Sequence, residues 1–224
     1  MAIITETPLK EDTSINPNPD LIFYFDDLLP SWIQQWGAEE MDSFEWRYGQ
    51  ASYPGGSRFF GQILKDHSGI HKTPWPNIVD IIYESFKRNK LTTLLPDAKL
   101  GEAKKVIVNG QLPSTPANPH ADTQSSNMWT LIYHCSDTDG DNLFFTSEEI
   151  PELKDKPRIN NIHRTQDILE IKRVPFKQGR CVLFPSWYIH QGLSPTDGWR
   201  ITIAFHMNIE TSMNPPRFIT SVLR

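Results

Sequence analysis

The sequence is poor in cysteine and has no long hydrophobic run. Its 224 residues include two cysteines, Cys135 and Cys181, too few for a disulfide framework and too far apart for a zinc knuckle. We therefore expect two buried free thiols, which fits a reducing cytoplasm. No stretch of about 18 apolar residues occurs, so no membrane-spanning helix is predicted. The N-terminal residues lack a basic region followed by an apolar one, so we expect no signal peptide.

Positive charge is also scarce. Lysines and arginines number 22 against 27 acidic residues, which gives a net charge of −5. A domain that binds nucleic acid through its phosphates usually carries a basic excess. The composition therefore argues against a nucleic-acid partner.

Aromatic residues and prolines, by contrast, are plentiful. Seven Trp and twelve Phe residues are enough to build a sizeable core, and eighteen prolines favour loops and turns over long helices. Residues 1–20 are polar and rich in Pro and Asn, so we expect an extended or flexible arm there. The length then favours a single domain over residues 21–224.

The hydrophobic pattern places helices early and strands late. Helices are predicted over residues 32–41 and 74–91, where apolar residues recur at helical spacing. Short strands are expected at residues 21–25, 44–53, 59–64, 104–109, 127–135, 143–146, 168–174, 180–184 and 199–208. Such a run of short strands predicts a mainly β sandwich or barrel with the helices outside it. The polar segment Ser147–Asn161 is too long for a tight connection, so it is a candidate substrate lid.

Two histidines and an aspartate are candidate metal ligands. His120 and Asp122 are two residues apart, so on an extended segment both side chains leave the same face. His190 can add a second imidazole from a later strand, which implies strands folded back on one another, as in a jelly roll. Two imidazoles and one carboxylate on one face of a metal leave the opposite positions open, which suits non-heme Fe(II) oxygen chemistry.

Arg200 is the candidate anion-binding residue. It lies ten residues beyond His190, in the strand-like run 199–208. Its guanidinium can offer a forked cation to a carboxylate.

Taken in order, these pieces resemble the Fe(II)/2-oxoglutarate-dependent oxygenase superfamily, and most of all its prolyl-4-hydroxylase-like branch with phage and bacterial members. The resemblance covers about residues 104–210 and rests on His120-Ala-Asp122, the strand 129–133, the run from Val174 to His190, and Trp199-Arg-Ile-Thr202. Arg200 stands where many members of that branch carry Lys, and an Arg pairs equally with a carboxylate.

The resemblance implies a fold, a reaction and a set of site residues. The fold is a double-stranded β-helix, and the reaction is hydroxylation of a C–H bond, with peptidyl proline as one candidate, driven by 2-oxoglutarate and dioxygen with release of succinate and CO2. The implied cofactor is Fe(II), with ascorbate as a candidate reductant, and the substrate is a peptide, a protein or a small molecule. His120, Asp122 and His190 would bind iron, and Arg200 would bind the distal carboxylate of 2-oxoglutarate. Tyr133, Thr202 and Asn109 are further candidate cosubstrate contacts.

Two other classes of protein remain open at this stage. A cupin-like module could use the same jelly roll to bind metal without redox chemistry, and a zinc hydrolase could use the same three ligands with an activated water. Of the remaining histidines, His134 and His206 lie on expected strands, where we interpret them as packed side chains rather than partners of the ligands.

Overall fold

The computed structural model describes residues 17–42, 44–51, 56–66, 76–123, 125–145 and 169–213. Residues 1–16 of the expected arm and the candidate lid Ser147–Asn161 lie outside this part of the chain. Within it, no helix combines the length and the apolar character needed to cross a bilayer.

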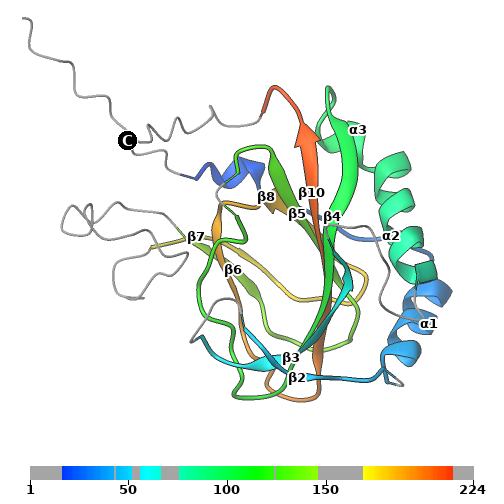
Figure 1. Ribbon diagram of the computed structural model, residues 1–224, viewed down its shortest axis with the longest axis vertical. Coiled ribbons are helices and arrows are strands. Elements are labelled where there is room, and N and C mark those ends of the chain that lie inside the picture. Colours follow the sequence, from blue (N-terminus) through cyan, green and yellow to red (C-terminus); the bar gives the residue numbers. More distant parts are fainter. Residues whose placement is uncertain are drawn as a thin grey trace, which may run out of the picture.

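Two antiparallel sheets form the body of the protein (Figure 1). The larger sheet has seven strands, in the order β1 (Phe23–Phe25), β8 (Cys181–Pro185), β5 (Met128–His134), β10 (Arg200–Glu210), β4 (Lys99–Gln111), β3 (Phe59–Lys65) and β2 (Tyr48–Gln50). The smaller sheet has three, in the order β7 (Glu170–Val174), β6 (Asn142–Phe145) and β9 (Ile189–Gly192). From β5 onward the chain passes repeatedly between the sheets, with β6, β7 and β9 in the smaller sheet and β8 and β10 in the larger one. This is the topology of a jelly roll and confirms the predicted fold class.

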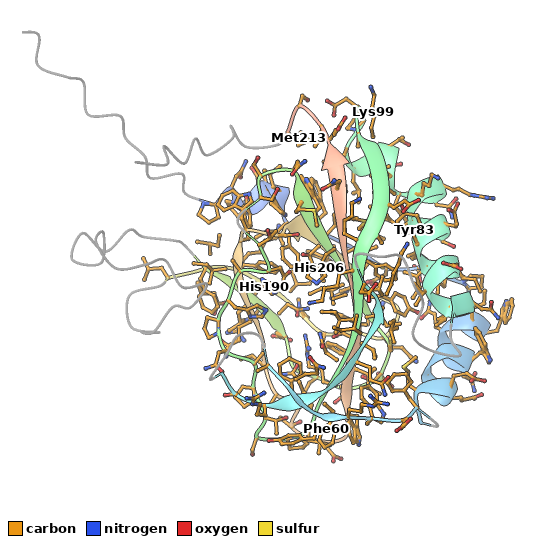
Figure 2. The ribbon with its side chains drawn as sticks, in the orientation of Figure 1. Phe60, Tyr83, Lys99, His190, His206 and Met213 are labelled. Carbon is orange, nitrogen blue, oxygen red and sulfur yellow. The ribbon has the colours of Figure 1, made fainter. Side chains whose placement is uncertain are left out.

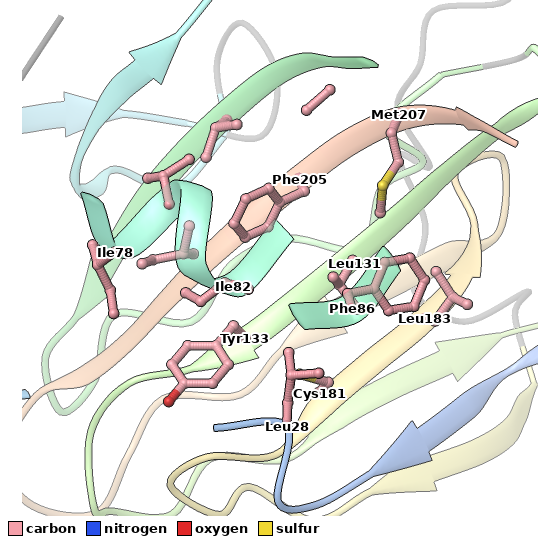
Figure 3. Close-up of a cluster of buried hydrophobic side chains, with 14 of the residues drawn as sticks. Leu28, Ile78, Ile82, Phe86, Leu131, Tyr133, Cys181, Leu183, Phe205 and Met207 are labelled. Carbon is pink, nitrogen blue, oxygen red and sulfur yellow. The ribbon is translucent and has the colours of Figure 1, made fainter. Parts of the chain in front are cut away.

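The helices cover the outer face of the larger sheet. Figure 1 shows α1 (Ser31–Asp42) and α2 (Pro76–Asn89) along the side of this sheet that is remote from β6 and β7. One face of α2 carries Ile78, Ile82 and Phe86, all nearly inaccessible to solvent, and they pack against side chains of β5, β8 and β10 (Figure 3). Two short helical turns, η1 (Pro19–Leu21) and α3 (Leu91–Leu94), complete the set. Both predicted helices are therefore confirmed, within two residues at each end.

Residues of β10 alternate between this core and the interior between the sheets. Ile201, Ile203 and Phe205 belong to the cluster under the helices. Ala204 instead packs with Phe144 of the smaller sheet. Because successive side chains on a strand leave opposite faces, the even-numbered residues of β10 from 200 to 206 face the interior.

The predicted strands differ from the observed ones at their ends. β4 begins at Lys99 rather than 104, because residues 99–103 continue the pairing with the far end of β10. β2 keeps only three of the residues predicted at 44–53. The strand β9 was not predicted as a separate element, since its four residues follow directly on a turn.

Candidate metal centre

The segment that carries His120 and Asp122 runs along β9 in an extended form. The backbone N–H of His120 donates to the carbonyl of His190 (3.0 Å), and the N–H of His190 donates back to that of His120 (2.9 Å). The N–H of Asp122 donates to the carbonyl of Ser186, in the turn between β8 and β9 (2.9 Å). This pairing sets His120 and His190 opposite one another and directs Asp122 to the same side as His120.

The three side chains meet in the interior. One candidate ligand atom from each of His120, Asp122 and His190 lies within 4.8 Å of the other two. Asp122 Oδ1 is 3.5 Å from His120 Nε2, and Asp122 Oδ2 is 3.8 Å from His190 Nε2. The two imidazole rings are 4.5 Å apart between centroids. Figure 2 shows His190 in the middle of the molecule, close to His206.

Backbone carbonyls hold both histidines in one tautomer. His120 Nδ1 lies 2.8 Å from the carbonyl oxygen of Asn118, and His190 Nδ1 lies 3.0 Å from that of Tyr188. A carbonyl can only accept, so each Nδ1 carries the proton and donates it. Each Nε2 is left with its lone pair directed towards Asp122, which is the form in which imidazole binds a metal.

Neighbouring residues hold the Asp122 carboxylate in place and keep it charged. The Thr130 hydroxyl donates to Asp122 Oδ2 (2.6 Å) and itself lies 2.8 Å from the hydroxyl of Ser186. His206 Nδ1 lies 3.7 Å from the same oxygen. Burial by itself raises the pKa of Asp122, but the interactions of its carboxylate with His206, His190 and His120 more than offset this effect, and the net pKa is well below the ordinary value.

His190 is buried among aromatic rings. Its ring centroid lies 4.7 Å from that of Phe184 and 6.2 Å from that of Phe144. Burial lowers the pKa of His190 to about 4, although the Asp122 carboxylate acts in the opposite direction. At neutral pH this imidazole is therefore uncharged, as a metal ligand must be.

Arg200 lies in the same interior, beside the strand that carries His190. The side chains of His190 and Gly192 leave the same face of β9, and a Cβ atom built on Gly192 would lie 2.8 Å from Arg200 Nη1. Arg200 is 3% exposed, and its guanidinium donates to three neutral oxygens, those of Gly140, Gln111 and Asn142. It forms no ion pair with any carboxylate of the described residues.

Two of the weaker cosubstrate candidates share this interior face. Thr202 pairs with Asn109 of β4 and with His134 of β5, so the three side chains form a row across the larger sheet. Thr202 is buried, and it follows Arg200 by two residues on the same face of β10. The structure therefore brings Arg200, Thr202 and Asn109 to one side of the sheet.

The expectation for Tyr133 is corrected by the structure. Its side chain lies in the core under the helices, among Ile82, Leu28 and Cys181 (Figure 3). The neighbouring residue His134 faces the interior instead, in register with Thr202. Both faces of β5 are buried, so the sequence of this strand did not reveal which face lines the site.

Four further residues of the site were missed or misread in the sequence. His206 was interpreted as a packed residue, although the two-residue spacing from Arg200 through Thr202 to His206 places it on the ligand-bearing face. Thr130 could have been found in the same way only with the register of β5 against β10 known. Gln111 and Asn142 come from separate strands and meet at Arg200 through tertiary pairing, for which the sequence carries no local signal.

No protein-family model and no curated protein sequence matches the chain. Solved structures do match it, at low sequence identity. The epimerase SnoN, in complex with Fe3+, alpha ketoglutarate and nogalamycin RO, is 15% identical with a TM-score of 0.55, over 86% of this chain and 81% of that one. The prolyl hydroxylase from Trichoplax adhaerens, in complex with a hypoxia inducible factor peptide fragment, is 13% identical with a TM-score of 0.54, over 85% of this chain and 84% of that one.

The carbocyclase SnoK from nogalamycin biosynthesis, which is non-heme and alpha ketoglutarate dependent, is 12% identical with a TM-score of 0.54, over 84% of this chain and 79% of that one. These proteins are named for different activities but share one architecture with this chain. The chain thus has the double-stranded β-helix fold of the Fe(II)/2-oxoglutarate-dependent oxygenases.

Proposed function

We propose that this protein is a non-heme Fe(II)- and 2-oxoglutarate-dependent dioxygenase that hydroxylates a C–H bond. One observation carries the proposal. Two imidazoles and a carboxylate converge in the interior of the fold, and a buried arginine that has no carboxylate partner among the described residues lies in the same interior. The first feature fits a metal ion, and the second fits an anionic cosubstrate.

The donor set fits Fe(II). His120, Asp122 and His190 offer two nitrogen atoms and one carboxylate oxygen, which is the ligand set of non-heme Fe(II) oxygenases with open positions for substrates. The fixed tautomers of the two histidines and the hydrogen bond from Thr130 to Asp122 prepare these donors before any metal arrives.

Arg200 fits the distal carboxylate of 2-oxoglutarate. A guanidinium has five N–H donors, and three of those of Arg200 are used by Gly140, Gln111 and Asn142. One N–H remains on each terminal nitrogen, which suits a carboxylate with two oxygens. Thr202 and Asn109 stay candidates for further contacts, since both lie on the face of Arg200.

When bound, Fe(II) with 2-oxoglutarate and dioxygen supplies the oxidation that converts a C–H bond to an alcohol and releases succinate and CO2. The chain supplies ligands, orientation and a dry site. His120, His190 and Asp122 hold the metal, and Arg200 orients the cosubstrate by its far end. Phe144 and Phe184 surround His190 with apolar surface, which keeps water from that side of the site.

Peptidyl proline is the first candidate substrate. Its support is the likeness of this fold to a prolyl hydroxylase solved with a peptide fragment. The equal likeness to SnoN, solved with nogalamycin RO, makes small molecules the second candidate. Ascorbate is the proposed reductant that keeps iron as Fe(II), and residues 21–224 are proposed to form one domain.

We propose the cytoplasm as the site of action. The support is that Cys135 and Cys181 are both buried and both free, as in proteins of a reducing compartment.

Reconstitution tests the proposed reaction. The metal-free chain is loaded with Fe(II) and 2-oxoglutarate without oxygen, then exposed to oxygen with candidate peptides and small molecules, and succinate is measured. We expect succinate above the rate without substrate, and none from His120→Ala. Metal binding without any succinate would favour the cupin-like alternative. Substrate cleavage supported by zinc without oxygen would favour the hydrolase.

A further inference from the structure

Arg200 is a buried cation, and its hydrogen-bond partners in the described part of the chain are all uncharged. Its Nε donates to the carbonyl of Gly140 (2.6 Å), its Nη1 to Gln111 Oε1 (2.7 Å) and its Nη2 to Asn142 Oδ1 (2.6 Å). The guanidinium also lies over the ring of Phe176, 4.9 Å from the centroid. A buried charge is normally paired with an opposite one, because leaving it unpaired destabilises the fold.

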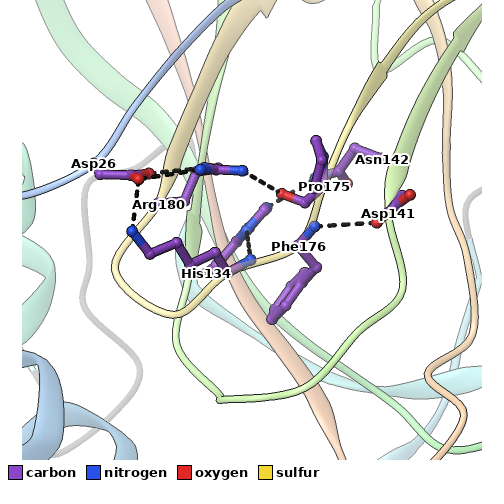
Figure 4. A network of polar contacts seen from close by, with 8 residues as sticks. Asp26, His134, Asp141, Asn142, Pro175, Phe176 and Arg180 are labelled. Carbon is purple, nitrogen blue, oxygen red and sulfur yellow. Dashed lines mark hydrogen bonds and ion pairs between the residues drawn. The ribbon is translucent and has the colours of Figure 1, made fainter.

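The carboxylate most available to Arg200 is engaged elsewhere. Asp141 directly precedes Asn142, and its carboxylate accepts the backbone N–H of Phe176 (3.2 Å; Figure 4). The same carboxylate lies 3.5 Å from Arg173 Nη1. Burial lowers the pKa of Arg200 to about 9, so the side chain is still protonated at neutral pH. The local structure therefore keeps a full positive charge in the interior without neutralising it.

Both amides are oriented so that only their oxygens face Arg200. Gln111 Nε2 donates to the carbonyls of Thr115 (3.1 Å) and Gly192 (3.3 Å), which leaves Oε1 for the guanidinium. Asn142 Nδ2 lies 2.8 Å from His134 Nε2, and the Asn142 oxygen is already used by Arg200, so the amide donates to the imidazole (Figure 4). His134 Nδ1 then carries the proton, so its 3.4 Å contact with the backbone nitrogen of Lys177 is not a hydrogen bond. His134 is itself stacked on Phe176, with ring centroids 4.0 Å apart.

The backbone also packs closely around the side chain of Arg200. A Cβ atom on Gly140 would lie 2.8 Å from Arg200 Cδ, and one on Gly192 would lie 2.8 Å from Nη1. Gly140 also has a φ of +103°, a conformation that other residues rarely adopt. The side chain of Arg200 is thus held on several sides, while one N–H on each terminal nitrogen is left over.

We propose that Gln111 and Asn142 are positioning residues that fix Arg200 through neutral oxygens and thereby preserve its charge for the distal carboxylate of the cosubstrate. His134 supports them by fixing the amide of Asn142. This inference rests on the proposed function, since it assumes that Arg200 receives 2-oxoglutarate. The two amides, together with the arginine, would then determine that the site prefers a cosubstrate with a second carboxylate.

The substitution Asn142→Asp tests the role of charge with almost no change in shape. It would place a carboxylate on Nη2, and His134 can donate to that carboxylate from its other tautomer. Gln111→Glu makes the same change from the opposite side of the guanidinium, although it also loses the two hydrogen bonds of the Gln111 amide. Asn77→Asp on the exposed surface of α2 is the matched control, because it adds the same charge far from the interior.

Two ligands that differ only in the distal carboxylate provide the readout. The affinities of 2-oxoglutarate and 2-oxopentanoate are measured by calorimetry on the full chain loaded with Mn(II), without turnover. For the wild type and Asn77→Asp we expect 2-oxoglutarate to bind more tightly by about 100-fold or more, as for a desolvated charge pair. In Asn142→Asp that preference should fall to within about 10-fold, with the affinities for Mn(II) and for 2-oxopentanoate unchanged.

The outcomes separate this inference from the proposed function. A wild-type chain that does not prefer 2-oxoglutarate would overturn the proposed cosubstrate and this inference with it. A wild-type preference that survives intact in both Asn142→Asp and Gln111→Glu would overturn the inference alone. Melting temperatures are measured in parallel, and we expect that of Asn142→Asp to equal or exceed the wild-type value, because the new carboxylate neutralises a buried charge. If Asn142→Asp does not fold, that expectation is contradicted, and Gln111→Glu decides the role of charge.

Discussion

Single hydrogen bonds prepare the three candidate ligands before a metal binds. The carbonyls of residues 118 and 188 fix the protons on His120 and His190, and Thr130 holds one oxygen of Asp122. Each of these contacts removes a rotation or a tautomer that the metal would otherwise have to select. Hydrogen-bond partners of metal ligands typically contribute about 10- to 100-fold to the affinity for the metal.

Substitution of Thr130 by Val tests this preparation. Valine keeps the shape of the side chain and removes the hydroxyl that donates to Asp122 (2.6 Å). We expect the Kd for Fe(II) or Mn(II) to rise by about 10- to 100-fold, measured by calorimetry without oxygen. Thr93→Val on the exposed face of α3 is the control and should leave the Kd unchanged. Unchanged metal affinity in Thr130→Val would mean that the hydroxyl does not orient the carboxylate.

Substitution of Gly192 by Ala tests the position of Arg200 without changing its charge. A methyl group there would lie 2.8 Å from Nη1, and the flexible arginine side chain would move before the strand does. We expect Gly192→Ala to weaken 2-oxoglutarate binding by about 10-fold or more, as a misplaced buried cation loses its partner. The affinity for metal should not change.

The control for this substitution is Gly37→Ala in α1. An added Cβ there makes an ordinary contact, 3.4 Å from Ile78 Cδ1, and alanine favours the helix. We expect normal 2-oxoglutarate affinity in this variant. An undisturbed affinity in Gly192→Ala as well would contradict the position assigned to Arg200.

The sequence revealed those site residues whose spacing alone places them on one face. His120 and Asp122 are two apart on an extended segment, and so are Arg200 and Thr202. Tyr133 was misplaced and His134 overlooked, because a strand buried on both faces gives no sign of which parity faces the site. Gln111 and Asn142 reach Arg200 only through the pairing of β4 with β10 and the packing of the two sheets.

At the scale of elements, Asp26, which follows β1, is bound by two basic residues from the turn before β8. Asp26 accepts hydrogen bonds from Arg180 Nε (2.7 Å) and Nη2 (3.0 Å), and Lys177 Nζ lies 2.8 Å away (Figure 4). The hydrogen bond from Arg180, with a smaller contribution from Lys177, lowers the pKa of Asp26 to about 2 although burial opposes it. A carboxyl with a lowered pKa stabilises the fold while ionised, and this stabilisation is lost as the pH falls through its folded-state pKa.

We predict that Asp26→Asn lowers the free energy of unfolding by about 1 kcal/mol at neutral pH, a value reduced by solvent screening at this partly exposed site. The difference from the wild type should shrink as the pH falls from about 4 to about 2, because Asp26 then becomes protonated in the wild type too. Urea unfolding at a series of pH values measures it. Asp137→Asn, an exposed residue, is the control. A difference in the free energy of unfolding that stays constant over this pH range would mean that the ionised carboxylate of Asp26 does not stabilise the fold.

The elements were predicted best where one side faces the core and the other faces solvent. The apolar face of α2 repeats at helical spacing, and the sequence identified that helix within two residues. The length of β4 was underestimated because Gly101 and Glu102 interrupt the pattern of a strand. They lie where the register with β10 shifts, and the pairing of Lys99 and Leu100 beyond them extends the strand. Tertiary pairing of this kind overrides local preference.

At the scale of the whole molecule, the metal would join parts of the chain that are far apart in sequence. His120 precedes β5, His190 lies in the smaller sheet, and Asp122 also interacts with Thr130 of the larger sheet. A ligand that binds only the folded state raises its stability by mass action. The metal should therefore stabilise the molecule as a whole and not only one loop.

Removal of the metal tests whether it stabilises the whole molecule. At a metal concentration near 100 times the Kd, we expect the free energy of unfolding to exceed that of the metal-free chain by about 2.7 kcal/mol. A chelator should reverse the increase, as followed by thermal or urea unfolding without oxygen. His120→Ala should show no response to metal. A response in that variant equal to the wild type would place the metal elsewhere in the chain.

The fate of dioxygen tests the proposed reaction at its central step. The chain is loaded with Fe(II) and 2-oxoglutarate, supplied with isotopically labelled dioxygen and a substrate that stimulates turnover, and the products are examined by mass spectrometry. We expect one labelled oxygen atom in each succinate and the other in the hydroxylated product, with neither product formed by His190→Ala. Succinate without label, or product formed equally well without oxygen, would contradict the proposed reaction.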